Sequence, residues 1–107
     1  MAAALKAHVQ SERIRELGLV TARMLGVRFD EAGIVVDDRF IGPGYSIPTE
    51  EGQEAAKMFA NLEGVLLDHV YTGKAAAGLI HYAMNGLFGD EENVLFIHPG
   101  GNAGLFY

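Results

Sequence analysis

The chain has 107 residues, a net charge of −6 and no cysteine, and 50% of its residues are hydrophobic. This length and composition are typical of one small compact domain, so we expect residues 1–107 to form a single domain that is neither disordered nor fibrous. The absence of cysteine excludes disulfides and zinc-thiolate sites. A negative charge without a basic cluster argues against nucleic acid as a partner.

Nothing in the sequence points to a membrane or to export. The apolar runs are far shorter than the ~20 residues that cross a bilayer. Residues 1–7 are small and apolar but lack the basic segment that opens a signal peptide. We therefore expect a cytoplasmic protein that has no membrane partner.

Apolar residues first recur at helical spacing between Ser11 and Leu25. This spacing predicts a helix that Ser11 caps at its start and Gly26 closes at its end. The β-branched run 34–36 follows and ends in two aspartates. It predicts a short buried strand that leads into a polar loop.

Two further helix and strand pairs follow along the chain. Thr49 stands where it can cap a second helix that ends at Gly64, and residues 65–67 predict the next strand. Residues 72–85 predict a third helix, and residues 94–97 predict the last strand.

The order of these elements is helix-strand-helix-strand-helix-strand, and each strand is apolar throughout instead of alternating. This order predicts the α/β class, with a short parallel sheet covered on both faces as a three-layer α/β/α fragment. Ligands of such sheets bind outside the carboxyl ends of the strands. The loops 68–71 and 98–101 each follow a predicted strand, so we expect them to face one crevice.

These two loops carry the residues best suited to chemistry. Tyr71 could exchange a proton with a ligand, or it could simply cover the core. The backbone N–H groups after Thr72 could hold a carboxylate, or Thr72 could cap the helix. Gly100 and Gly101 could let a ring or phosphate approach closely, or they could form a plain turn. The four histidines lack metal-ligand spacing, so we expect no metal site.

Two stretches stand out, GYSIPTEEGQEAAKMFANLEGVLLDHVYTGKAAAGLI and NVLFIHPGGNAGLF. Together they resemble the C-terminal third of the D-cysteine desulfhydrase and 1-aminocyclopropane-1-carboxylate deaminase family. These enzymes depend on pyridoxal phosphate and have the tryptophan-synthase-β fold type. The resemblance covers residues 11–106, and its most specific parts are the Tyr-Thr-Gly-Lys stretch and the final histidine with its glycine pair.

The resemblance implies roles for the loop residues. Tyr71 matches an active-site tyrosine that transfers protons beside the substrate, and Tyr45 matches a second tyrosine that faces the same substrate. Thr72 stands where the deaminases carry glutamate, so the chain looks like the desulfhydrase branch, with Thr72 in contact with substrate. The last loop would lie beside the pyridoxal ring, and its cofactor-binding residues would be His98, Pro99, Gly100 and Gly101.

Two positions depart from the family pattern. His69 stands in place of a proline. Pro99 stands in place of a threonine whose hydroxyl can bond to the pyridine nitrogen, and proline supplies neither a hydroxyl nor an N–H group. The family's Schiff-base lysine and phosphate-binding glycine loop belong to an N-terminal part that has no match here, and Lys74 is not that lysine.

We therefore expect the C-terminal portion of a pyridoxal-phosphate-dependent lyase that converts a small amino acid, D-cysteine, to pyruvate, ammonia and sulfide. As an isolated chain it would be inactive, and it would form a homo-oligomer or join a complementing N-terminal chain. The alternative is a non-catalytic binding or assembly fragment that docks on a partner chain or on itself, because a three-strand sheet exposes a parallel edge. A third reading, a gene remnant without present function, is mildly favoured by His69 and Pro99.

Overall fold

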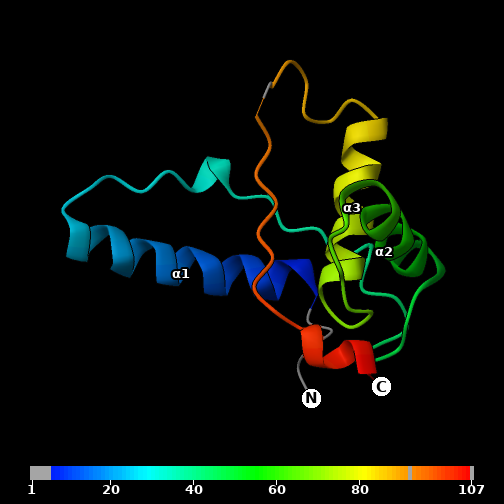
Figure 1. Cartoon of the computed structure of the whole chain (residues 1–107). Coiled ribbons are helices and arrows are strands. Elements are labelled where there is room, and N and C mark those ends of the chain that lie inside the picture. The colour runs from blue at the N-terminus through cyan, green and yellow to red at the C-terminus, as the bar shows by residue number, and fades with distance from the viewer. Residues whose placement is uncertain (1–5, 92, 107) are drawn as a thin grey trace. The chain divides into compact units, whose positions relative to one another are not determined.

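The computed structural model describes residues 6–91 and 93–106 (Figure 1). The chain divides into two compact units, which we name the N-terminal unit, Met1–Arg39, and the C-terminal unit, Phe40–Tyr107. Each unit has its own internal packing. The expectation that residues 1–107 form a single domain stays a prediction.

All regular structure in the described residues is helical, so the predicted α/β class is wrong and this part of the chain is all-α. The three α-helices are α1 (Ala7–Leu25), α2 (Glu50–Glu63) and α3 (Thr72–Met84). Two short 3-10 helices accompany them, η1 (Glu31–Gly33) and η2 (Asn102–Phe106). Over the residues that the structure describes, no helix is long and apolar enough to span a membrane.

The start of α1 differs from its prediction. The helix begins at Ala7 and not at Ser11, and its N-cap residue Lys6 makes no side-chain capping bond. Instead, the backbone N–H of Ala7 donates to Asp38 Oδ2 at 2.9 Å. The predicted end is confirmed, since Gly26 closes the helix in the left-handed conformation with φ of 66°.

The N-terminal unit has a thin core. Ala22 is the only buried hydrophobic side chain among its described residues, whereas Leu17 and Met24 on the same helix are 70% and 83% exposed. Gly18 lies directly against the ring of Phe29, where there is no room for a Cβ atom. The unit is therefore held by a few close contacts and buries little apolar surface.

In the C-terminal unit, α2 and α3 lie side by side (Figure 1). The predicted cap of α2 is confirmed, because Thr49 Oγ1 accepts a hydrogen bond from the Gly52 N–H at 3.1 Å. Gly64, with φ of 66°, ends the helix as expected. The third helix begins at Thr72 as predicted and ends at Met84.

Glycines let the N-terminal ends of α2 and α3 approach each other at backbone distance. A Cβ atom on Gly73 would lie 2.6 Å from the carbonyl oxygen of Asp68 and 3.0 Å from that of Gly52. Both neighbours are backbone atoms that cannot rotate away. Any side chain at position 73 would therefore push the two helix starts apart.

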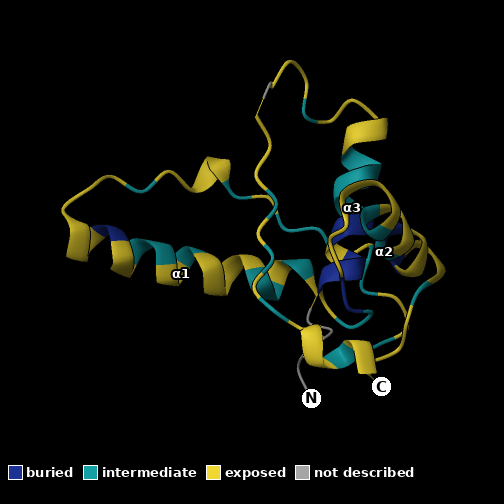
Figure 2. Cartoon of the chain, viewed as in Figure 1, coloured by how far each residue is buried: buried dark blue, intermediate teal, exposed yellow. Residues whose placement is uncertain are grey.

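The small core of the C-terminal unit lies between these two helices. Buried residues cluster where the first turns of α3 meet α2, as Figure 2 shows by their dark blue colour. The buried apolar residues are Ala55, Leu67, Ala76 and Ala77, and their partly buried neighbours are Phe40, Ala56, Phe59, Ile80 and Phe96.

The three predicted strands form no ladder in the described residues. Residues 65–67 and 94–97 do come close, since His98 Nε2 lies 2.9 Å from the Leu66 carbonyl oxygen and the rings of Phe59 and Phe96 are 5.5 Å apart. A short β-branched run becomes a strand only where another backbone offers it hydrogen bonds. The described chain supplies side-chain contacts at this place and no backbone ladder, which is why the sheet prediction fails.

Candidate functional site

The candidate site surrounds Asp68, which is 1% exposed and follows the buried Leu67. Its Oδ1 accepts hydrogen bonds from the backbone N–H of Thr72 at 3.0 Å and from Thr72 Oγ1 at 2.6 Å. Its Oδ2 accepts from the N–H groups of Val70 at 2.8 Å and Tyr71 at 2.7 Å. One carboxylate thus caps the start of α3 and fixes the turn from residue 68 to residue 72, which we call the Asp68 turn.

These bonds change the acidity of Asp68. Burial favours the neutral form and raises its pKa, but the hydrogen bonds from Thr72, Tyr71 and Val70 favour the carboxylate and outweigh burial. The net result is that the pKa of Asp68 falls from 3.8 to about 2. The turn therefore keeps its negative charge at neutral pH.

Tyr71 lies within the Asp68 turn, and its side chain contacts that of Tyr45. The two hydroxyl oxygens are 3.0 Å apart, and the ring centroids are 6.1 Å apart at an angle of 55°. Both side chains remain open to solvent, with Tyr45 44% and Tyr71 55% exposed. We call these two residues the tyrosine pair.

The tyrosine pair also changes the acidity of Tyr71. Its hydrogen bond with Tyr45, partial desolvation and the nearby negative charge of Asp68 all raise the pKa of Tyr71 above its ordinary value of 10.0. Tyr71 therefore stays a neutral phenol at physiological pH, able to donate one hydrogen bond and to accept others.

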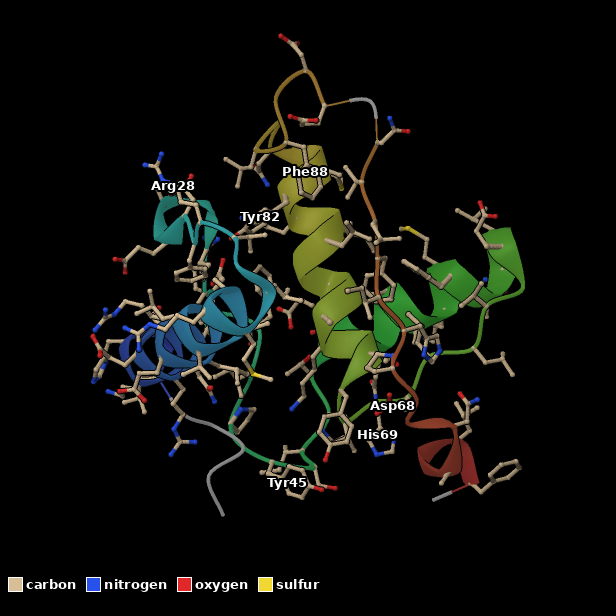
Figure 3. All side chains as sticks on the ribbon, turned by 90° about the vertical axis from the view of Figure 1, so that its left-hand side faces the viewer. Arg28, Tyr45, Asp68, His69, Tyr82 and Phe88 are labelled. Atoms are coloured by element: carbon tan, nitrogen blue, oxygen red, sulfur yellow. The ribbon has the colours of Figure 1, made fainter. Side chains whose placement is uncertain are left out.

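Figure 3 shows where the site lies on α3. The labelled side chains of Tyr45, Asp68 and His69 gather at the N-terminal end of the helix, whereas Tyr82 and Phe88 lie at its opposite end. The apolar groove between α2 and α3, with a volume of about 400 Å³, is lined by other residues and includes no member of the tyrosine pair. The site is thus an open surface at a helix start.

The C-terminal loop packs against the other side of the Asp68 carboxylate. Gly101, with φ of 88°, lies so close to this carboxylate that a Cβ atom would collide with it. Gly100 has φ of 139° and open space around it. The structure therefore brings the loop 100–104 and the Asp68 turn together, although no sheet carries them.

Three predicted site residues have little to offer a ligand, because two already make hydrogen bonds within the chain and the third has no N–H group. Thr72 is 2% exposed, and its hydroxyl donates to the Asp68 carboxylate while accepting from the Asp68 N–H at 2.9 Å. His98 uses Nε2 on the Leu66 carbonyl, and Pro99 has no N–H to offer. Asp68 thus holds the position at the helix start that a ligand carboxylate could take, and the substrate contact expected for Thr72 stays a prediction.

Sequence reasoning missed two residues of this site, Asp68 and Lys74. Lys74 is 7% exposed, and its ammonium donates to the carbonyl oxygens of Ile41 at 2.7 Å and Gly44 at 3.2 Å. The available signals were an aspartate between an apolar run and a helix start, and a lone lysine inside a stretch of glycine and alanine. A charged residue inside an apolar or small-residue stretch indicates a charge that is buried and held by hydrogen bonds.

The residues of the site do not fit a covalently attached pyridoxal phosphate. The sequence has three lysines. Lys74 is committed to two carbonyls, Lys57 is exposed on α2 with its Nζ 3.5 Å from Glu54, and Lys6 belongs to the N-terminal unit. Open space at Gly100 leaves room beside the loop for a flat ring, but Pro99 offers that ring no donor. The site itself therefore contributes one lysine, Lys74, and the hydrogen bonds of its ammonium do not leave it free as an anchor.

Compared with known protein families, the chain matches no family model. The resemblance to the desulfhydrase family therefore stays a prediction from the sequence, based chiefly on the Tyr-Thr-Gly-Lys stretch and the final histidine with its glycine pair.

Proposed function

We propose that the tyrosine pair binds a small amino acid, as the substrate-facing part of a D-cysteine desulfhydrase-like lyase. The single observation that carries this proposal is the 3.0 Å distance between two solvent-exposed phenol oxygens at the start of a helix. Two exposed tyrosines gain little from such a contact for stability alone, whereas two hydroxyls at this spacing suit a polar ligand.

The chemistry of the pair matches the two ends of an amino acid. A phenol can donate to a carboxylate oxygen and accept from an ammonium group, and the pair offers both roles side by side. The pKa of Tyr71 lies above the ordinary 10.0, so its phenol is protonated at neutral pH and can donate a hydrogen bond. The bonds from the N–H groups of Val70 and Tyr71 to Asp68 hold its backbone in place. Orientation of substrate and proton delivery are thus the roles proposed for the pair.

Under this proposal the cofactor and its lysine come from a partner chain or from further residues of a longer protein. The isolated chain would then bind amino acid weakly and leave it unchanged. The cytoplasmic location and the homo-oligomer expected from the sequence stay predictions.

Binding can be tested by nuclear magnetic resonance on protein with isotope-labelled tyrosine rings. Titration with D-cysteine should shift the signals of Tyr45 and Tyr71 with a dissociation constant of about 1 mM, typical of a few solvent-exposed hydrogen bonds. Tyr82, at the far end of α3, is the internal control. Replacement by phenylalanine at position 45 or 71 should weaken binding several-fold, and unshifted signals from both tyrosines would reject the proposal.

Activity gives a second test. Purified chain mixed with pyridoxal phosphate and D-cysteine should release no sulfide, whereas addition of a lysine-bearing pyridoxal domain should allow release. Steady sulfide release by the chain alone would contradict the need for a second part.

A second candidate function is non-catalytic docking on a partner chain or on a second copy. Exposed apolar residues favour it, since Leu66, Leu95 and Ile97 are 58%, 87% and 73% exposed within two segments that lie close together. Sedimentation over a range of concentrations separates the candidates. A chain that stays monomeric at high concentration, and binds no added partner, would contradict docking.

A further inference from the structure

Tyr45 lies in a segment without regular structure, yet its hydroxyl is held on Tyr71. The chain from Ile41 to Ser46 makes sharp turns, with φ of 75° at Gly42 and 63° at Ser46. Positive φ at a residue other than glycine is unfavourable and persists only where neighbouring contacts hold it. Something outside this segment must therefore fix its path.

The contacts that fix it come from the first turn of α3. Lys74 lies in the first turn of α3, three residues after Tyr71, which is the N-cap residue of this helix. The ammonium of Lys74 reaches the Ile41 carbonyl at 2.7 Å and the Gly44 carbonyl at 3.2 Å. Gly44 directly precedes Tyr45, and its carbonyl also accepts the Ile47 N–H at 3.3 Å. The start of α3 thus holds the loop 41–46 at two places. Lys74 binds backbone carbonyls of the loop, and Tyr71 binds the side chain of Tyr45.

The burial of Lys74 supports a role beyond packing. Its side chain is 7% exposed, and among the described residues its ammonium bonds to two backbone carbonyls. A buried charge is costly unless hydrogen bonds compensate it, and an apolar residue of similar length would fill this space without that cost. What an apolar residue could not do is fix two carbonyls in a given orientation.

We propose that Lys74 is a positioning residue that sets Tyr45 on Tyr71 by clamping the carbonyls of Ile41 and Gly44. The clamp would orient Tyr45 for the amino-acid site proposed above, so its functional meaning depends on that proposal. The clamp itself can be measured without any substrate, so the two proposals can fail separately.

The test uses the full chain with Lys74→Met, which keeps the apolar stem and removes the three donors. The readouts are the titration of Tyr71 and the ring-to-ring nuclear Overhauser contact between Tyr45 and Tyr71. In the variant, the pKa of Tyr71 should fall toward 10.0, and the contact should weaken or vanish. Lys74→Arg, which keeps donors, should retain part of both signals, and Lys57→Met on the exposed face of α2 should retain them fully.

A double variant separates positioning from general loosening. Tyr45→Phe should lower the pKa of Tyr71 by itself, and adding Lys74→Met should then lower it no further, because both changes remove the same hydrogen bond. Additive effects would overturn the proposal. A folded Lys74→Met variant with an unchanged Tyr71 titration and an intact ring contact would overturn it as well.

If Lys74→Met does not fold, a measurement on the wild-type chain still tests the clamp. The ammonium protons of Lys74 should exchange slowly with water and show contacts to residues 41–44, and fast exchange without contacts would overturn the proposal. Where Lys74→Met does fold, D-cysteine titration separates the two proposals. Loss of the ring contact together with tenfold weaker D-cysteine binding than the wild-type chain supports both proposals. Loss of the ring contact, when the wild-type chain itself binds no D-cysteine, supports the clamp and rejects the amino-acid site.

Discussion

The first backbone N–H groups of α1 and α3 are both bound by an aspartate, but the two aspartates lie at very different distances along the chain. Each helix must satisfy backbone N–H groups that have no partner within the helix. At α1, one N–H reaches one carboxylate oxygen of Asp38, far along the chain. At α3, Asp68 accepts the N–H and the hydroxyl of Thr72, the first helical residue, and also the N–H groups of Val70 and Tyr71, which precede the helix. A start whose acceptor lies within four residues is what allows α3 to present a defined site there.

The largest effect is expected when the capping carboxylate of each helix start is removed. Asp68→Ala should lower the free energy of unfolding by about 3 kcal/mol, because the two buried donors of Thr72 and the part-buried N–H groups of Val70 and Tyr71 lose this acceptor. Asp38→Ala should cost about 1 kcal/mol, since it removes one capping bond. Urea unfolding followed by circular dichroism measures both. Equal losses for the two variants would contradict the comparison.

A second change tests whether α3 owes its position to a close backbone contact. Gly73→Ala should lower the free energy of unfolding by about 2 to 3 kcal/mol, because the new methyl group meets backbone oxygen atoms that cannot move aside. Gly78→Ala is the matched control on the same helix, where the nearest atom belongs to the Phe40 ring at 3.4 Å. It should be neutral, or stabilising by up to about 1 kcal/mol through better helix propensity. If both variants lose stability alike, the helix contact at Gly73 is not special.

The smallest expected effect is the dependence of stability on pH that the Asp68 carboxylate causes. Asp68 has a pKa of about 2 in the folded chain against 3.8 ordinarily, so its carboxylate stabilises the fold fully above about pH 4. This contribution, about 2 kcal/mol for the shift, is lost as pH falls through about 2. The measurement is the free energy of unfolding from pH 5 to pH 2 for wild type and Asp68→Asn. The two curves should converge toward low pH, and parallel curves would show that Asp68 titrates normally.

The ends of the helices were largely predictable from the sequence. Thr49, Gly26 and Gly64 act at short range, because a cap bonds to the backbone within a few residues of itself. The start of α1 was not predictable in this way, since its acceptor is Asp38. Local signals thus succeeded wherever both partners of a bond lie close in the sequence.

The strands were not predictable, because residues 65–67 and 94–97 have apolar compositions that suit a strand and an exposed extended segment alike. In the described residues, a histidine side chain and a ring contact join these segments where a ladder was expected. A strand is defined by its neighbour, and no property of three or four residues reveals whether that neighbour exists.

Parts of the site were predictable. Its setting at the start of α3, and Tyr71 as a candidate, followed from the sequence pattern, and Tyr45 followed from the family resemblance. The bond between the two tyrosines, and the grip of Lys74 on carbonyls 30 and 33 residues away, did not. No spacing rule connects such distant positions.

The sequence by itself determined where α2 and α3 begin and where α1 and α2 end, that the chain carries negative charge, and which polar residues stand beside the start of α3. Only the tertiary structure decided that the chain forms no sheet in its described part, and that Asp68, Lys74 and the tyrosine pair gather at one place. The physical reason is range. Capping and helix propensity act over about four residues, whereas strand pairing and buried polar bonds depend on atoms that only folding brings together.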